Sequence, residues 1–147
     1  MAITVSQLLS HLAIAADIPV AEVASGELKT TQGANCWKYG SDYKYGGPVD
    51  CSGLITAIAQ KYNSKYPRLT SASMQSMCSG PISTMPNIPG IFVWRSGHVG
   101  IFTGKNANGD KYTIEAFDSK YNVGRRGNRL TSDTAFTHWG YLDFVQY

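Results

Sequence analysis

The sequence has few cysteines, and their spacing is not typical of a metal site or a disulfide-rich domain. There are three, Cys36, Cys51 and Cys78, and no two of them are separated by only two residues. An odd number without CxxC spacing argues against a zinc site and against a complete disulfide framework. Cys36 and Cys78 are the pair that would leave Cys51 free. We expect instead three reduced thiols, as in a cytoplasmic product.

Long apolar runs are also absent, and the first residues do not have the pattern expected of a secretory leader. No stretch approaches the length of a membrane-spanning helix. Residues 1–20, MAITVSQLLSHLAIAADIPV, lack a basic first segment and carry His11 and Asp17 inside the apolar part. These features argue against a standard signal peptide.

Charge is sparse, and no basic surface is evident. The sequence has 13 Lys and Arg residues and 10 Asp and Glu residues, which gives a net charge of +3. The longest basic cluster begins at Arg125-Arg126, and no aromatic residues alternate with it, so a nucleic-acid-binding footprint is not indicated. We expect these two arginines in a solvated loop. The mild positive charge suits an anionic partner without requiring one.

The composition that remains is that of a globular domain. With 147 residues, of which 43% are hydrophobic, the chain is long enough to bury a core without metals or disulfides. There is no internal repeat and no linker to a second module, so we expect one domain over residues 1–147.

Helical patterns occupy the first half of the chain. Apolar residues recur at helical spacing over 4–17, with Thr4 or Ser6 near the start, and Ile14 is included in the apolar set. The stretch 19–47 reads as irregular. A second helix is expected from Cys51 to Tyr62 with Asp50 as its cap, and a short third one over 71–78.

Strand patterns occupy the second half. IFVWRSGHVGIFTG, residues 91–104, alternates and predicts two strands around 95–97. An Asn108-Gly109 turn then leads into a returning strand, KYTIEAF, and THWGYLDFVQY supplies at least one more. Helices followed by consecutive antiparallel strands predict an α+β fold.

Cys51 has the setting of a nucleophile. It follows a glycine-rich turn and opens a helix, where unpaired backbone N–H groups and the helix dipole lower the pKa of a thiol. Its neighbours Ser52 and Gly53 are small, which leaves space for a substrate carbonyl and exposes N–H groups that could hold an oxyanion. A structural cysteine is expected in mid-helix on the apolar face instead.

His98 is the candidate base among three histidines. It begins an apolar strand after a Ser-Gly turn, whereas His11 lies within the first helix and His138 precedes a tryptophan, where packing or hydrogen bonding is expected. If the strands flanking Asn108-Gly109 pair, Glu115 returns toward the level of His98 and can orient it. The alternative for Glu115, an outward-facing edge residue paired with a lysine, is equally open at this point.

These residues lie in motifs that resemble the NlpC-type papain-like cysteine peptidases, a family of bacterial and phage cell-wall hydrolases. The motifs are YKYGGPVDCSGLI, YPRLTSASM, GHVGIF, YTIEAF and THWGYL, in the family's order over residues 37–141. Residues 1–36, an N-terminal helix and an irregular segment, lie outside the strongest part. The resemblance implies a papain-like α+β fold, in which N-terminal helices pack on a central antiparallel sheet and the nucleophile stands at a helix N-terminus.

The resemblance also implies residue roles. Cys51 is the expected nucleophile, His98 the general base and then acid, and Glu115 the residue that orients His98. Tyr43 matches a family tyrosine that contacts substrate. Ser52 and Arg68 are further candidate substrate contacts, with a helix-start role as the alternative for the arginine.

One aromatic and one basic residue, Tyr45 and Arg95, are also considered as parts of the site. Tyr45 stands where the family often has Trp, and we expect it to pack under the turn. Arg95 is a possible carboxylate contact whose alternative is a role in its turn.

The implied activity is hydrolysis of peptidoglycan by a cysteine endopeptidase that cuts the stem peptide, usually between γ-D-glutamate and the diamino acid. The partner is the stem peptide, with no metal, no organic cofactor, no nucleic acid, no membrane span and a monomeric state. Such a protein is made in the cytoplasm and reaches the wall after release or export, as a phage lysin or an exported effector does.

Other readings use some of the same residues. An N-acetylmuramoyl-L-alanine amidase of CHAP type, or a papain-like acyltransferase, would keep the Cys and the His. A wall-binding module without chemistry would keep only the aromatic surface, and an interaction protein would contain Cys51 as an inert buried thiol.

Overall fold

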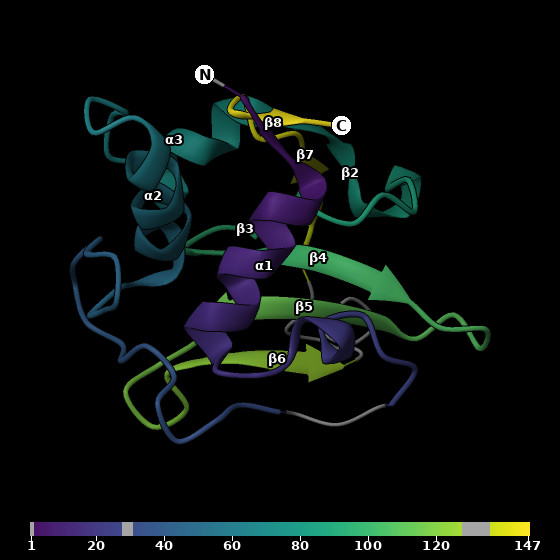
Figure 1. Cartoon of the computed structure of the whole chain (residues 1–147). Coiled ribbons are helices and arrows are strands. Elements are labelled where there is room, and N and C mark those ends of the chain that lie inside the picture. Colours follow the sequence, from purple (N-terminus) through teal and green to yellow (C-terminus); the bar gives the residue numbers. More distant parts are fainter. Residues whose placement is uncertain (1, 28–30, 128–135) are drawn as a thin grey trace.

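The computed structural model describes residues 2–27, 31–127 and 136–147. Two helices lie against one face of a central sheet, and the two termini lie close together (Figure 1). The elements are β1 (Ile3–Thr4), α1 (Val5–Ala16), η1 (Val20–Glu22), α2 (Cys51–Tyr62), α3 (Ser71–Met74), η2 (Gln75–Met77), β2 (Cys78–Pro81), η3 (Ile82–Thr84), β3 (Phe92–Arg95), β4 (His98–Lys105), β5 (Lys111–Ala116), β6 (Val123–Gly127), β7 (His138–Gly140) and β8 (Val145–Gln146).

Helix α1 forms where the sequence predicts it. Thr4 and Gln7 make a reciprocal capping box at its start. Leu8 and Leu12 are fully buried against the sheet side, as helical spacing requires. Ile14, in contrast, is 53% exposed, because it lies off the stripe that the buried residues define.

Helix α2 has the predicted bounds and is more deeply buried than its pattern suggests. The Asp50 side chain accepts the backbone N–H of Gly53 and caps the first turn. Every residue from Cys51 to Ala59 is buried. Gly53 lets the loop at Asp42 pack closely on the helix, because a Cβ at Gly53 would lie 2.0 Å from the carbonyl oxygen of Asp42.

The main sheet is antiparallel, with the strand order β2-β7-β3-β4-β5-β6. Strands β3 to β6 follow one another as a meander, and the turn between β3 and β4 pairs Arg95 with His98. β7 then crosses to the opposite side and inserts between β2 and β3. The α+β class is confirmed, as are the hairpins on either side of β4. β2 and β6 were not predicted, because neither has an apolar alternation.

A short parallel pair, β1 with β8, holds the two ends of the chain together. The main core lies between α1, α2 and one sheet face, where Leu12 and Ile58 meet Ile101 and Ile114. In the part of the chain that the structure describes, no helix is long and apolar enough to cross a membrane. Cys36, Cys51 and Cys78 are all free thiols.

The expectation of a solvated loop at Arg125-Arg126 is wrong. Both residues belong to β6, and Arg125 has no exposed surface. Its guanidinium lies 4.0 Å from the ring centroid of Tyr112 and donates to the carbonyl oxygens of Val23, Ser25 and Glu27. Arg126 lies over the Phe117 ring. The five N–H donors of an arginine can tie an irregular segment to a sheet edge, which is a structural role.

Replacing Arg125 by alanine therefore removes the donors that the carbonyl groups of the buried Val23 and of Ser25 and Glu27 use. We expect Arg125→Ala to lower the free energy of unfolding by about 3 kcal/mol, since unsatisfied buried polar groups are costly. Urea denaturation followed by tryptophan fluorescence measures this loss. Lys105→Ala, at an exposed residue of β4, is the control. Equal stability of the two variants would contradict the structural role.

Candidate active site

Cys51 is the first residue of α2, and its sulfur lies against the start of β4. The His98 side chain and the Val99 backbone N–H lie close enough to the thiol to lower its pKa. The side chain is 9% exposed, so it is close to the surface but shielded from bulk water. Preceding it, Gly46 and Gly47 have positive φ angles, and this tight turn brings Asp50 to the cap position.

His98 and Glu115 are joined by a hydrogen bond of 2.7 Å between Nε2 and Oε1. In the antiparallel β4–β5 hairpin, Ile101 pairs with Ile114. Glu115, the next residue along β5, therefore lies toward the start of β4, where His98 stands. Glu115 has no exposed surface, so the alternative of an outward-facing residue paired with a lysine is excluded. Nε2 bonds to the carboxylate, which leaves Nδ1 for the thiol of Cys51.

Packing fixes the orientation of this pair. The Phe136 ring stacks on the His98 ring with a centroid distance of 5.6 Å and an interplanar angle of 19°. Thr113, two residues before Glu115, donates its hydroxyl to the second carboxylate oxygen. Gly100 supplies the space, because a Cβ there would lie 2.6 Å from Cγ of Glu115. The imidazole and the carboxylate are thus held before any substrate binds.

The electrostatics favour an ion pair between Cys51 and His98. Burial opposes ionisation of the thiol, but the hydrogen bond to His98 and the charge of that imidazolium outweigh it and hold the pKa of Cys51 below its ordinary value of 9.0. Burial likewise opposes protonation of His98. The hydrogen bonds to Cys51 and Glu115, with their negative charges, outweigh it and raise the pKa of His98 to about 9. Both shifts favour the form in which a thiolate faces an imidazolium over the neutral pair.

The three candidate substrate contacts, Tyr43, Ser52 and Arg68, lie together beside the thiol. Arg68 donates to Oδ2 of Asp50 at 2.6 Å, and its guanidinium lies 4.9 Å from the Tyr43 ring centroid. Ser52 is 3% exposed, with its hydroxyl toward Asp50. Tyr43 is the most exposed of the three, at 40%. The space beside Gly53 is filled by the loop carbonyl of Asp42 rather than left open for substrate.

The other histidines have structural contacts. His11 bonds to the hydroxyls of Tyr45 and Tyr62, and Tyr45 packs on Trp37 under the turn as expected. His138 bonds to Thr137 through Nδ1 and contacts the Trp94 ring edge, as its sequence position indicates.

Arg95 lies opposite His98 at the end of β3 and is only partly exposed. Its Nε is buried and has no hydrogen-bond partner among the described residues.

Two residues of the site were missed. Thr113 could have been found, since positions i and i−2 of a strand share a face. Tyr39 carried no signal in the sequence. Burial, followed by the negative charges of Cys51, Asp50 and Asp118, raises its pKa, which keeps the hydroxyl protonated close to the nucleophile.

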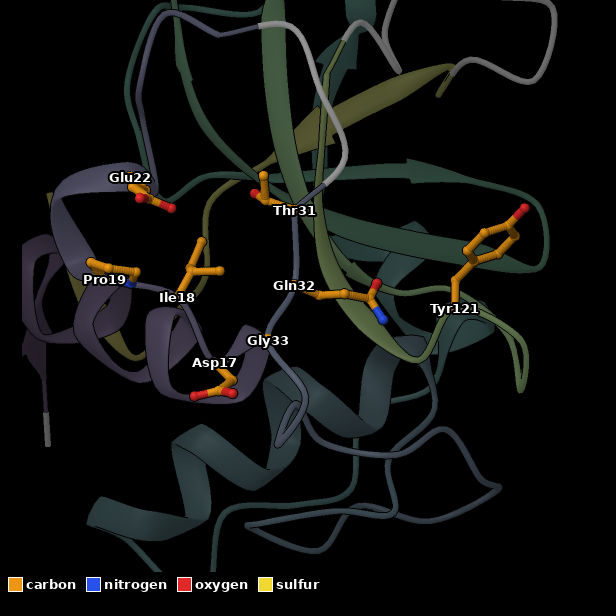
Figure 2. A pocket seen from close by; sticks show the side chains of 8 residues that line it. All are labelled: Asp17, Ile18, Pro19, Glu22, Thr31, Gln32, Gly33 and Tyr121. Atoms are coloured by element: carbon orange, nitrogen blue, oxygen red, sulfur yellow. The ribbon is translucent and has the colours of Figure 1, made fainter.

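A separate open pocket of about 560 Å³ lies where the end of α1 meets the segment around Thr31. Asp17 and Glu22 line it together with Gln32 and Tyr121 (Figure 2). None of the three proposed catalytic residues lines it, and Asp17 already accepts the backbone N–H of Asn35. It is not the site of the thiol chemistry.

No protein-family model, no curated protein and no solved structure matches this sequence. The side chains around Cys51 and their geometry are therefore the basis for assigning a function to this protein.

Selective alkylation tests the ion pair. At neutral pH we expect iodoacetamide to modify Cys51 at least about tenfold faster than Cys78, because one unit of pKa is a factor of ten in thiolate and burial raises the pKa of Cys78. Peptide mapping by mass spectrometry measures both rates in one sample. His98→Ala should remove the advantage. Equal rates in the unmodified protein would contradict a thiolate at Cys51.

Proposed function

We propose that this protein is a cysteine peptidase of the NlpC type that cleaves the peptide stem of peptidoglycan. The observation that carries the proposal is the contact of Cys51, at a helix N-terminus, with a His98 imidazole oriented by the buried Glu115. Nucleophile, base and orienting residue in this relation support acyl transfer through a covalent intermediate. The mixed helix and antiparallel-sheet architecture is compatible with the papain-like fold that the motifs suggest.

The first half of the proposed reaction forms a thioester. The Cys51 thiolate attacks the carbonyl carbon of the scissile amide, and the negative charge moves to the carbonyl oxygen. The Cys51 backbone N–H, at the first position of α2, is available to that oxygen. The His98 imidazolium then gives its proton to the amine as the C–N bond breaks.

The second half releases the product. Neutral His98 accepts a proton from water as the water oxygen attacks the thioester carbonyl. The C–S bond breaks, the acid leaves, and the thiolate and imidazolium are restored. Glu115 holds the imidazole through both halves and stabilises its positive form, which is why its burial beside His98 matters.

The charges beside the thiol are compatible with a stem peptide. Arg68 and Asp50 are paired but remain partly exposed, at 27% and 22% of their side chains. They offer both a cation and an anion to a substrate that carries carboxylates and an amine. The scissile bond that we propose lies between γ-D-glutamate and the diamino acid, as the sequence motifs suggest.

Product analysis tests the activity. We expect the wild-type protein to release fragments ending in γ-D-glutamate from purified peptidoglycan, and Cys51→Ala to release none because it lacks the nucleophile. Mass spectrometry of the soluble products measures both. Stems released intact from the glycan would identify an amidase instead. A Cys51→Ala variant as active as the wild type would rule out the mechanism.

Glu115→Gln tests the orienting role through pH dependence. In the wild type, kcat/KM should rise with pH as Cys51 loses its proton, at a pKa below the ordinary value of 9.0. It should fall again near pH 9, where His98 loses its proton. The amide keeps a hydrogen bond but loses the negative charge, so the pKa of His98 drops and the alkaline limb moves to lower pH. We expect activity to fall by about tenfold or more without disappearing.

Glu22→Gln, at an exposed position remote from the triad in sequence, is the control for this change. An alkaline limb that stays in place in Glu115→Gln would contradict the role of Glu115.

A further inference from the structure

A second cavity, of about 350 Å³, opens at the end of the sheet where β2 and β3 terminate and β7 begins. Its walls come from η2, β2, β3 and β7, and the lining residues are Gln75, Cys78, Ser79, Gly80, Pro81, Trp94 and His138. The mechanism proposed above uses none of them.

The cavity lies in the same row of the sheet as Val99, whose backbone N–H faces the Cys51 thiol. Trp94 pairs with His138 on one side and with Val99 on the other. Neighbouring strands are about 4.8 Å apart, so His138 lies about 10 Å from Val99. Since Val99 follows His98 and its N–H acts on the Cys51 thiol, the cavity is within reach of a substrate held at the thiol.

The lining is aromatic and polar but carries little charge. Trp94 forms a wall and is held there by its indole N–H, which donates to the Ser71 carbonyl at 2.7 Å. The side chains of Gln75 and Ser79 have no hydrogen-bond partner among the described residues. In those same residues, no carboxylate, lysine or arginine lines the cavity. An aromatic wall with neutral donors and acceptors suits a sugar carrying hydroxyl and acetamido groups.

The charged pair next to the thiol has a different chemistry. There the paired charges of Asp50 and Arg68 lie under the Tyr43 ring. A peptidoglycan stem carries its free charges on the peptide, whereas the adjoining amino sugars are neutral apart from that linkage. The peptide beyond the cut therefore suits the charged flank, and the glycan suits the neutral cavity.

We propose that this cavity binds an N-acetylhexosamine of the glycan strand, and that the enzyme acts on stems still attached to sugar. The inference depends on the proposed peptidase function. Alanine and γ-glutamate separate the sugar from the proposed scissile bond, a span of roughly 10 Å in extended chain. That span is comparable to the roughly 10 Å between His138 and Val99 across the sheet row. An amidase would need its sugar next to the sulfur.

A binding experiment tests the cavity without activity. We would titrate ¹⁵N-labelled full-length Cys51→Ala with N,N′-diacetylchitobiose and follow the indole N–H resonances. Trp94 should shift, whereas Trp37, which packs on Tyr45, should not. Cellobiose, which has the same linkage without acetamido groups, should shift Trp94 less. No shift of Trp94, or equal shifts with both sugars, overturns the assignment.

A kinetic experiment tests the use of the cavity. The readout is the ratio of kcat/KM for a disaccharide-bearing stem peptide to that for the same peptide without sugar. Gln75→Ala and the cavity-filling Ser79→Leu, both at exposed positions, should lower this ratio about tenfold, as expected for a lost polar contact. Gln146→Ala, exposed on β8, should keep the wild-type ratio. Equal losses on both substrates would overturn the sugar subsite.

The two experiments separate the two proposals. Peptide cleavage without binding of the disaccharide overturns the sugar subsite and keeps the peptidase. Binding of the disaccharide at Trp94 without cleavage of any peptidoglycan overturns the peptidase and keeps a sugar-binding cavity.

Discussion

A carboxyl group with no exposed surface is costly in a protein interior unless its oxygens are bonded, and Glu115 is such a group. One oxygen accepts from Thr113 and the other meets His98, so the carboxylate is fully engaged. Against the effect of burial, the hydrogen bonds with Cys51 and Glu115 raise the pKa of His98, and the protonated imidazole lowers the pKa of Cys51. Cys51 and the buried Glu115 together favour the protonated imidazole, and Gly100 is needed because any larger residue would displace Glu115.

The surroundings of the thiol are asymmetric, which bears on how a substrate would lie. Asp50 caps α2 and binds Arg68 at once, so the same carboxylate that positions Cys51 also builds the charged flank. Across the sheet row, Trp94 forms the wall of an uncharged cavity. A substrate with a neutral end and a charged end would find a matching surface for each, which supports a defined polarity of binding.

Sequence patterns predicted much of the fold where the controlling interactions are local. Helix α2 begins at Cys51 because Asp50 is a good cap and its apolar residues have helical spacing. The β4–β5 hairpin follows from the Asn108-Gly109 turn, and its register alone brought Glu115 toward His98. The prediction failed at Arg125, because nothing in its neighbourhood reveals that distant carbonyl groups need its donors.

By itself the sequence determined which residues begin α2 and β4, and that Glu115 returns toward the level of His98, since capping, periodicity and hairpin register act over a few residues; which way Glu115 faces was decided by the tertiary structure. Only the tertiary structure decided that Cys51 meets His98, that Phe136 stacks on the imidazole, and that β7 inserts beside β3 to form the wall of the second cavity. Those contacts join segments far apart in the chain. They depend on how α2 packs across the sheet, and burial of the whole core sets that packing.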